Sequence, residues 1–143
     1  MKIRIYERKD EKQVISLWKS CNLIVPLNNP VSDIERKLKI DPDLFLIGEI
    51  NGKIIATVMG GYEGHRGWIN YLAVHPDHRR LGFGIKIMKE IENKLKEKDC
   101  PKINLQVRAA NKDVIAFYNK LGFSDDNVIG LGKRLIYDNN FDL

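Results

Sequence analysis

The pattern of apolar and polar positions divides the chain into short segments of two kinds. Residues 2–8 alternate with a period of two, as a half-buried strand does. Residues 44–50 and 53–61 are apolar runs joined by Asn51-Gly52, which is a strong signal for a tight β-hairpin. Further strands are predicted at residues 68–74, 103–107, 123–128 and 131–137, the last two as a closing pair.

Four other segments place apolar residues at helical spacing, each after a residue suited to a helix start. These segments begin near Asp10, Asn29, Gly84 and Asn111. Pro30 fits a first helical position, and Gly122 fits the residue just beyond the last helix. The order β-α-α-β-β-β-α-β-α-β-β predicts an α/β fold, with one mixed sheet and helices on its faces. Residues 138–143 are expected to fray.

Composition narrows the class of protein. The 143 residues fit one domain, residues 1–143, and 43% apolar with 30% charged residues is ordinary for a globular protein. The net charge of +5 permits an anionic small molecule, while the charges of residues 86–102 lie opposite an apolar helix face and do not indicate nucleic-acid binding. Two cysteines without a CxxC spacing, no signal peptide and no membrane-spanning segment predict a cytoplasmic protein.

The junction between the strand at residues 68–74 and the following helix carries the most specific chemistry. Pro76 ends the strand, and Arg79-Arg80-Leu81-Gly82-Phe83-Gly84 follows. The two glycines let the backbone approach a ligand, and amides from about Arg80 to Ile85 can donate hydrogen bonds to phosphate oxygens. Two glycines alone are weak evidence, but their place between a strand and a helix predicts a phosphate-bearing ligand. Neither a P-loop lysine nor a βαβ dinucleotide motif accompanies them.

This junction resembles the cofactor motif of the GCN5-related N-acetyltransferase (GNAT) superfamily, R/Q-x-x-G-x-G/A after a strand that ends in V-x-P. Here the strand ends in Val74-His75-Pro76, and residues 79–84 match the remainder, with Arg80 where many members carry glycine. The resemblance implies that the pyrophosphate of acetyl-coenzyme A (acetyl-CoA) binds these amides and that its pantetheine arm pairs with residues 72–74. The cofactor-binding residues that it implies are Leu72, Val74, Arg79, Arg80, Gly82, Gly84, Ile85 and Asn111.

A second block, from Asn111 to Phe123, fits N-x(6)-Y-x-x-L-G-F, a familiar ending for these enzymes. Taken alone, Asn111 is an ordinary helix cap and Tyr118 an ordinary core aromatic. The resemblance gives Asn111 a pantetheine contact and Tyr118 the role of general acid, because a pre-positioned phenol can protonate the departing thiolate. The two blocks together imply a GNAT fold: a single, mixed, mostly antiparallel twisted sheet of six to seven strands flanked by four helices.

The resemblance implies direct transfer of an acetyl group to a primary amine of a small molecule or protein, in a ternary complex. A backbone N–H near Leu72 is expected to polarise the thioester carbonyl. The ribosomal-protein alanine acetyltransferases resemble this chain around residues 105–108 and carry a glutamate base where Gln106 stands here. An amide cannot act as a base. Glu63, in the hairpin after residues 60–62, is therefore the candidate base. The alternative is that Glu63 is simply a solvent-exposed residue of the hairpin.

The missing glutamate leaves open a second hypothesis, a catalytically silent CoA-binding sensor or regulatory module. In this superfamily the N-terminal helices shape the acceptor pocket, which makes the candidate lining residues Trp18, Cys21, Asn28, Asn29, Asp33 and Tyr62. Asp33 or Glu35 would suit a cationic amine. His75 and His78 lack a third ligand nearby, so no metal is expected. The expected partners are acetyl-CoA and an amine acceptor, without nucleic acid or membrane, and the resemblance also allows a homodimer.

Overall fold

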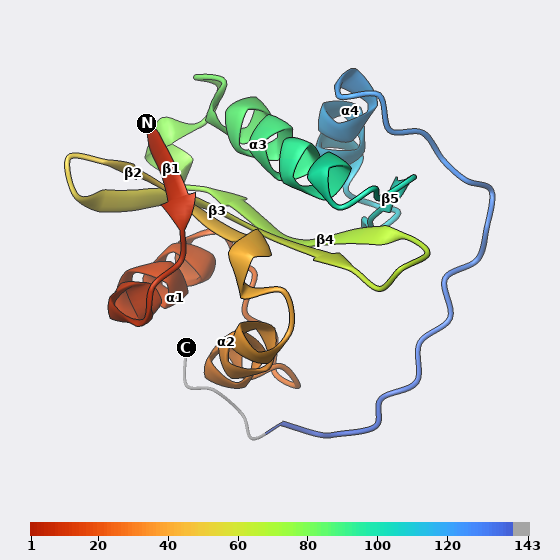
Figure 1. Cartoon of the computed structure of the whole chain (residues 1–143), viewed down its shortest axis with the longest axis horizontal. Helices are drawn as coiled ribbons and strands as arrows, with labels where there is room; N and C mark the ends of the chain where they lie inside the picture. Colours follow the sequence, from red (N-terminus) through yellow and green to blue (C-terminus); the bar gives the residue numbers. More distant parts are fainter. Residues whose placement is uncertain (139–143) are drawn as a thin grey trace.

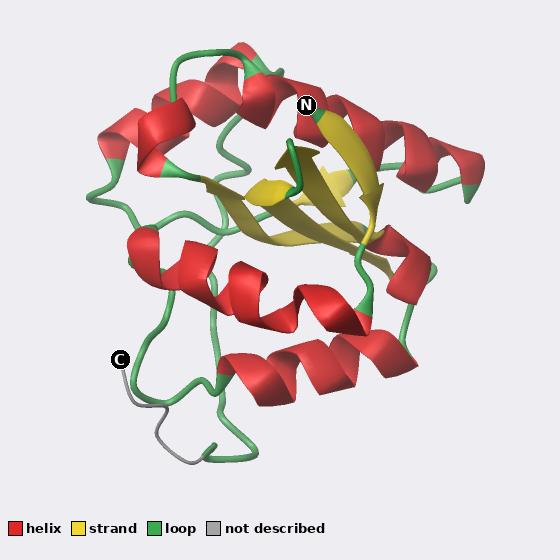
Figure 2. Ribbon diagram, turned by 90° about the vertical axis from the view of Figure 1, so that its left-hand side faces the viewer, coloured by secondary structure: helices red, strands yellow, loops and turns green. Residues whose placement is uncertain are grey.

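A computed structural model describes residues 1–138 as a five-stranded sheet between two pairs of helices (Figures 1 and 2). The strands are β1 (Lys2–Ile5), β2 (Phe45–Ile50), β3 (Lys53–Tyr62), β4 (Gly67–Val74) and β5 (Ile103–Asn104). They lie in the order β1-β2-β3-β4-β5, and each neighbouring pair is antiparallel except β4 and β5, which run parallel. The mixed sheet agrees with the predicted fold class, although it has five strands where six to seven were expected.

The helices cover both faces of the sheet. One face carries α1 (Glu11–Ser20) and α2 (Pro30–Lys39), and the other carries α3 (Phe83–Glu97) and α4 (Lys112–Lys120) (Figure 1). Short 3₁₀ turns are η1 (Arg8–Asp10), η2 (Pro42–Leu44) and η3 (Pro76–His78). All four predicted helices are therefore present.

Of the caps predicted for the two N-terminal helices, one is present in the structure and one is not. Asn29 caps α2 as predicted, since its Oδ1 accepts from the amide of Val31 at 2.9 Å. Asp10 does not cap α1 with its side chain. Its carboxylate instead accepts the amide of Glu7 at 2.8 Å and two hydrogen bonds from Arg4, at 2.8 and 2.9 Å. An unpaired buried carboxylate costs more free energy than a missing helix cap. Asp10 therefore pairs with Arg4 of β1 instead of capping α1.

Two layers of core lie on either side of the sheet. Beneath α1 and α2, Trp18 is fully buried and stacks on Tyr71 of β4, with ring centroids 3.8 Å apart. Beneath α3 and α4, the core is built from buried apolar residues of the two helices and of β2 and β3, including Leu46, Val58, Ile87 and Ile91. Burial of these side chains is the main favourable contribution to folding, and it fixes both helix pairs against one sheet.

Strand β4 contains a bulge that the sequence does not announce. Thr57 of β3 pairs with Ala73 and Met59 pairs with Asn70, so two residues of β4, Tyr71 and Leu72, stand opposite the single residue between them. Tyr71 has a φ of +50°, a conformation that costs a bulky residue free energy. The buried Thr57 hydroxyl holds this conformation, since it donates to the carbonyl of Tyr71 at 2.8 Å and accepts from Trp18 Nε1 at 2.9 Å.

The predicted closing strands are absent from the described residues. Residues 123–128 and 131–137 have no partner in the sheet, and β5 covers only Ile103–Asn104 rather than residues 103–107. Parallel pairing with β4 ends at Trp68↔Asn104, before the bulge of β4 is reached. A strand forms only where a neighbour accepts its hydrogen bonds, and residues 123–137 have none in this structure. Asp138, which was expected to fray, binds Arg36 at 2.6 Å, while residues 139–143 lie outside the described part.

The hydroxyl of Thr57 offers a direct test of the bulge. We expect Thr57→Val to lower the free energy of unfolding by roughly 2–4 kcal/mol, because valine leaves the Trp18 N–H and the Tyr71 carbonyl unsatisfied in the core. Thr57→Ser keeps the hydroxyl and is the matched control, with a smaller loss from the missing methyl group. Urea unfolding of the three proteins measures the difference. Equal stability of the valine variant and the native protein would contradict this account of the bulge.

Candidate functional site

The loop after β4 exposes an uncapped helix start. Arg80 and Gly82 both have left-handed backbone conformations, with φ of +63° and +83°. Gly82 occupies the N-cap position of α3, where no side chain accepts a hydrogen bond and the first turn holds no acidic residue. A Cβ at Gly82 would meet no atom within 4 Å, so the backbone faces open space. The amides of the first turn of α3, together with the positive end of the helix dipole, therefore form a site for an anion.

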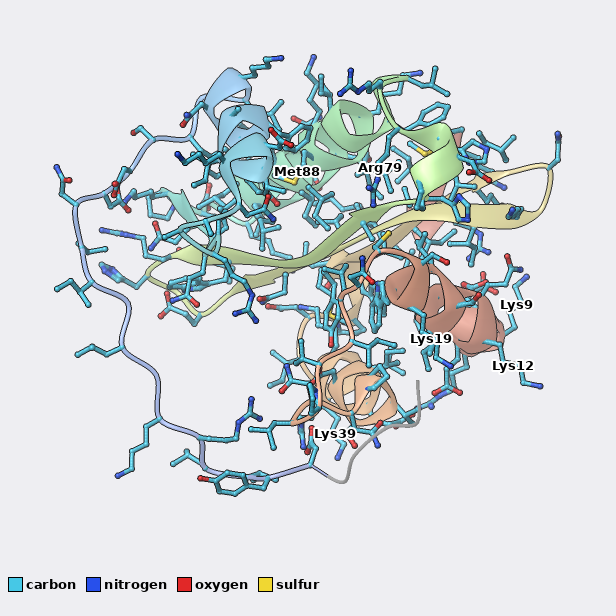
Figure 3. The ribbon with its side chains drawn as sticks, turned by 180° about the vertical axis from the view of Figure 1, so that it is seen from behind. Lys9, Lys12, Lys19, Lys39, Arg79 and Met88 are labelled. Atoms are coloured by element: carbon cyan, nitrogen blue, oxygen red, sulfur yellow. The ribbon has the colours of Figure 1, made fainter. Side chains whose placement is uncertain are left out.

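Arg79 holds the loop against the end of β4. Its Nε donates to the carbonyl of Val74 at 3.1 Å, and Figure 3 shows the side chain directed inward beside the start of α3. The thiol of Cys21, at the end of α1, donates to the same carbonyl at 3.4 Å. Burial raises the pKa of Cys21, and the neighbouring Arg79 opposes that shift. Arg79 and Val74, both predicted to bind cofactor, thus act on one another, and Arg79 fixes the shape of the loop.

Gly84 has a different role from Gly82. A Cβ at Gly84 would lie 3.2 Å from Phe117 Cζ and 3.6 Å from Val74 Cγ2. The absence of a side chain there lets α4 pack against the first turn of α3. A side chain at Gly84 would therefore meet Phe117. Ile85, in the same turn, is exposed.

Tyr118 follows Phe117 and lies on the inner side of α4. Its side chain is buried, and its ring meets Phe117 and Phe123 edge to face, with centroids 5.2 and 5.5 Å away. Burial raises the pKa of Tyr118 to about 12. The phenol is therefore protonated at neutral pH, which is the state that a general acid requires. Asn111 stands before α4 and is exposed, but its side chain makes no cap hydrogen bond to the helix.

A groove of about 1550 Å³ opens between the β5 segment and the chain that follows α4. Tyr118 lines it, together with Gln106 and Trp68. Two sequence-predicted features, the Asn111–Phe123 block and Gln106, therefore meet at one place. The Arg79–Gly84 loop is connected to this groove through α4, because Phe117, the neighbour of Tyr118, packs against Gly84.

Glu63 is not brought to this place. Its carboxylate Oε1 accepts the amide of His65 at 2.9 Å and also the amide of Arg66, so it closes the hairpin turn between β3 and β4. From Gly67, where β4 begins, to Leu72 in the bulge is five residues, or about 16 Å of strand. Within residues 1–138 no hydrogen bond or ion pair joins Glu63 to Tyr118 or to the loop after β4. The geometry does not support Glu63 as the base.

On the other face of the sheet, several of the predicted acceptor-pocket residues are already bonded to residues outside the predicted set. Asp33 accepts from the Tyr71 hydroxyl at 2.6 Å and from Arg36 at 3.3 Å, so its charge is already partnered. Glu35 pairs with Arg8 at 2.7 Å. Tyr71 is the residue that sequence reasoning missed, since it stacks on Trp18, binds Asp33 and forms the bulge. An aromatic residue in a strand gives no signal of a left-handed backbone, which only the three-dimensional structure reveals.

Two further observations concern ligands and membranes. Among residues 1–138 there is no group of three or more His, Cys, Asp or Glu side chains that could hold a metal ion. The imidazole of His75 accepts the amide of Asp77 at 3.1 Å, which gives it a local structural role. No helix within the described chain is long and apolar enough to cross a bilayer.

Comparison with known proteins identifies the family. A family model described as "Acetyltransferase (GNAT) family" matches residues 11–123. The chain is 50% identical over 141 residues to an acetyltransferase of Yersinia pestis, covering 99% of this chain and 100% of the relative. The chain belongs to the GNAT family, whose members transfer acetyl groups from acetyl-CoA.

Solved structures support the fold. A ribosomal-protein alanine N-acetyltransferase of Escherichia coli superposes with a TM-score of 0.74 at 20% identity, covering 88% of this chain and 79% of that one. An aminoglycoside antibiotic 6′-N-acetyltransferase of Acinetobacter haemolyticus gives a TM-score of 0.74 at 18% identity, covering 95% of this chain and 100% of that one. At these identities the similarity concerns the fold alone, which confirms the GNAT architecture.

Proposed function

We propose that the chain is an acetyl-CoA-dependent N-acetyltransferase that moves the acetyl group directly to a primary amine in a ternary complex. The observation that carries the proposal is the uncapped start of α3, where Arg80 and Gly82 turn backbone amides toward open space beside the bulge of β4. The proposed cofactor residues are Leu72, Val74, Arg79, Arg80, Gly82, Gly84, Ile85 and Asn111.

Each part of the site has a distinct task in this proposal. The amides from Arg80 to Ile85 hold the pyrophosphate, because several charge-assisted hydrogen bonds act together there. The amide of Leu72 polarises the thioester carbonyl, since the bulge leaves that residue without a partner on β3. Tyr118 delivers a proton to the departing thiolate. The acceptor attacks the thioester carbonyl in its neutral form, and the C–S bond breaks after the C–N bond has formed. The proton that the acceptor nitrogen then loses passes to water and from water to the Tyr118 phenolate, so no side chain is assigned to its removal.

The decisive experiment measures thiol release from acetyl-CoA across a panel of primary amines, small molecules and peptides. Turnover with any amine supports the enzyme. Tight binding of coenzyme A without turnover for any acceptor would instead support the alternative, a catalytically silent CoA-binding sensor. That alternative draws on one observation, that Gln106 rather than a carboxylate lines the groove beside Tyr118.

Gly82 tests the cofactor site. We expect Gly82→Val to weaken coenzyme A binding at least tenfold, because a β-branched residue resists the left-handed backbone that aims the amides. Gly52→Val is the matched control, since Gly52 also has a positive φ, of +79°, in open space, but lies in the β2–β3 hairpin. Titration calorimetry compares the two. If both variants bind coenzyme A as the native protein does, the loop is not the pyrophosphate site.

Tyr118 tests the proton donor. We expect Tyr118→Phe to lower kcat by on the order of 10²-fold while the affinity for coenzyme A stays the same, because only the proton donor is removed. Tyr6→Phe is the control, since Tyr6 is also buried, with a pKa raised to about 12, but packs beneath α1. Steady-state kinetics with a reactive amine measures the effect. Full activity of the Tyr118 variant would remove its role as general acid.

Glu63 tests the absence of a carboxylate base. We expect Glu63→Gln to leave the pH dependence of kcat/KM unchanged, because the amide oxygen still accepts the two turn amides and no proton passes through this residue. Glu97→Gln, at an exposed position at the end of α3, corrects for the change in net charge. A profile that loses its acidic limb only in the Glu63 variant would restore Glu63 as the base.

A further inference from the structure

Lys37 of α2 is a half-buried positive charge that pairs with no carboxylate within residues 1–138. Its Nζ donates a hydrogen bond to the carbonyl of Gly60 in β3, which uses one of the three donors of the ammonium group. A charge taken out of water costs free energy unless an anion compensates it. Two donors of Lys37 therefore remain for an anion that the described chain does not supply.

The two carboxylates that attract Lys37, those of Asp41 and Asp43, have other partners. Asp41 accepts the backbone amide of Tyr62 at 3.3 Å, and Asp43 pairs with Lys98 at 3.2 Å. Removal from water outweighs their attraction and lowers the pKa of Lys37. The surroundings of Lys37 therefore compensate its charge only in part.

Lys37 borders an open part of the sheet. Apart from its neighbours in the chain, a Cβ at Gly61 would meet a single atom within 4 Å, Lys37 Nζ at 3.6 Å. Trp68 lies opposite Gly61, and Asn70 lies opposite Met59, which belongs to the core beneath α1 and α2. Because opposite residues of antiparallel strands share one face of the sheet, Trp68 and Asn70 face the side of α2. Both are exposed, and we call Gly61, Trp68 and Asn70 the shelf.

The shelf runs from Lys37 to the bulge of β4. Trp68, at its far end, is four residues before Leu72, whose amide is the proposed donor to the thioester carbonyl, and four residues of strand span about 13 Å. Helix α2 follows the same path, since Asp33 binds the Tyr71 hydroxyl at 2.6 Å and Lys37 lies one helical turn further on, on the same side. An acceptor whose amine reaches the bulge therefore extends over the shelf toward Lys37.

We propose that Lys37 binds a carboxylate of the acceptor, and that the preferred acceptors are primary amines whose carboxylate lies about 10 Å from the nitrogen. This distance is about 13 Å of shelf less about 3 Å for the hydrogen bond to Lys37. An extended tripeptide has this span between its amino terminus and its carboxyl terminus, at about 3.3–3.6 Å per residue. The inference names a substrate class and rests on the proposed function.

A carboxylate fits this position better than a phosphate group does. One ammonium group matches the single charge of a carboxylate, whereas a phosphate would bring a second negative charge near Asp41 and Asp43 without a partner for it. The rest of the shelf suits a peptide-like chain, because Trp68 offers an aromatic surface and Asn70 an amide that can donate and accept hydrogen bonds.

Thiol release from acetyl-CoA with triglycine and with its C-terminal amide tests the proposal on the full chain. The two acceptors share the same amino terminus and differ only in the carboxylate. We expect kcat/KM of the native protein to be about tenfold or more higher for triglycine than for the amide, because the amide leaves Lys37 without its anion. Triglycine should also exceed diglycine and pentaglycine, whose carboxylates fall short of Lys37 or pass beyond it.

Lys37→Met removes the charge and keeps a side chain of similar length. We expect it to lower kcat/KM for triglycine about tenfold, mainly by raising KM, while kcat/KM for the amide and the affinity for coenzyme A stay the same. Lys39→Met, at an exposed position of the same helix, is the control and should keep the preference for triglycine. Thermal unfolding of the three proteins checks that the fold is kept.

Equal kcat/KM of the native protein for triglycine and its amide would overturn the proposal. A Lys37→Met variant that keeps the preference would overturn it as well. A variant that loses activity toward both acceptors equally would do the same, because Lys37 would then only tie α2 to β3.

If the native protein acetylates none of these peptides, calorimetric titration of the CoA-bound protein separates the two conclusions. Tighter binding of triglycine than of its amide, lost in Lys37→Met, supports the carboxylate site although the proposed acetyl transfer fails for these amines. Equal binding of the two peptides, or no binding of either, overturns the carboxylate site itself.

Discussion

The hydroxyl of Thr57 is the contact on which the arrangement of the site depends. It joins Trp18 of α1 to the carbonyl of Tyr71, and so fixes a bulky residue in a left-handed conformation in the middle of a strand. Such a conformation persists only where the surrounding structure determines it fully. Here a buried hydrogen-bond chain and the stacked ring of Trp18 do so. The bulge lies two residues before Val74, whose carbonyl accepts from Arg79 in the loop that leads to α3.

The start of α3 and the helix α4, which carries Tyr118, are in contact at Gly84. Because no side chain stands there, Phe117 of α4 rests on the first turn of α3. Tyr118 is the next residue of α4, so this contact also positions Tyr118 relative to the amides at the start of α3. The two sequence blocks that mark the family are therefore two sides of one packing contact. The glycine at position 84 thus serves packing rather than backbone conformation, since its φ is not in the left-handed region.

Sequence patterns were sufficient where a signal is local. The hairpin at Asn51-Gly52 and the cap of α2 by Asn29 follow from the chemistry of one or two residues, and both are confirmed. Asp10 was assigned wrongly because its real partner, Arg4, lies on a strand, and no local pattern reports that pairing. The closing strands failed for a related reason. Their alternation is real, but a strand also needs a neighbour that accepts its hydrogen bonds, and alternation alone does not say where that neighbour lies.

The site also has an asymmetry that bears on how the reaction responds to pH. Its proposed acid, Tyr118, is buried and has a pKa raised to about 12, so it stays protonated through the neutral range. No side chain is proposed as the base, since Gln106 cannot titrate and the carboxylate of Glu63 accepts the amides of its own hairpin turn. Under the proposed mechanism, the rate should then rise with pH as the acceptor amine loses its proton. The limb of the profile on the acidic side would follow the pKa of the amine, and it would move when the amine is changed.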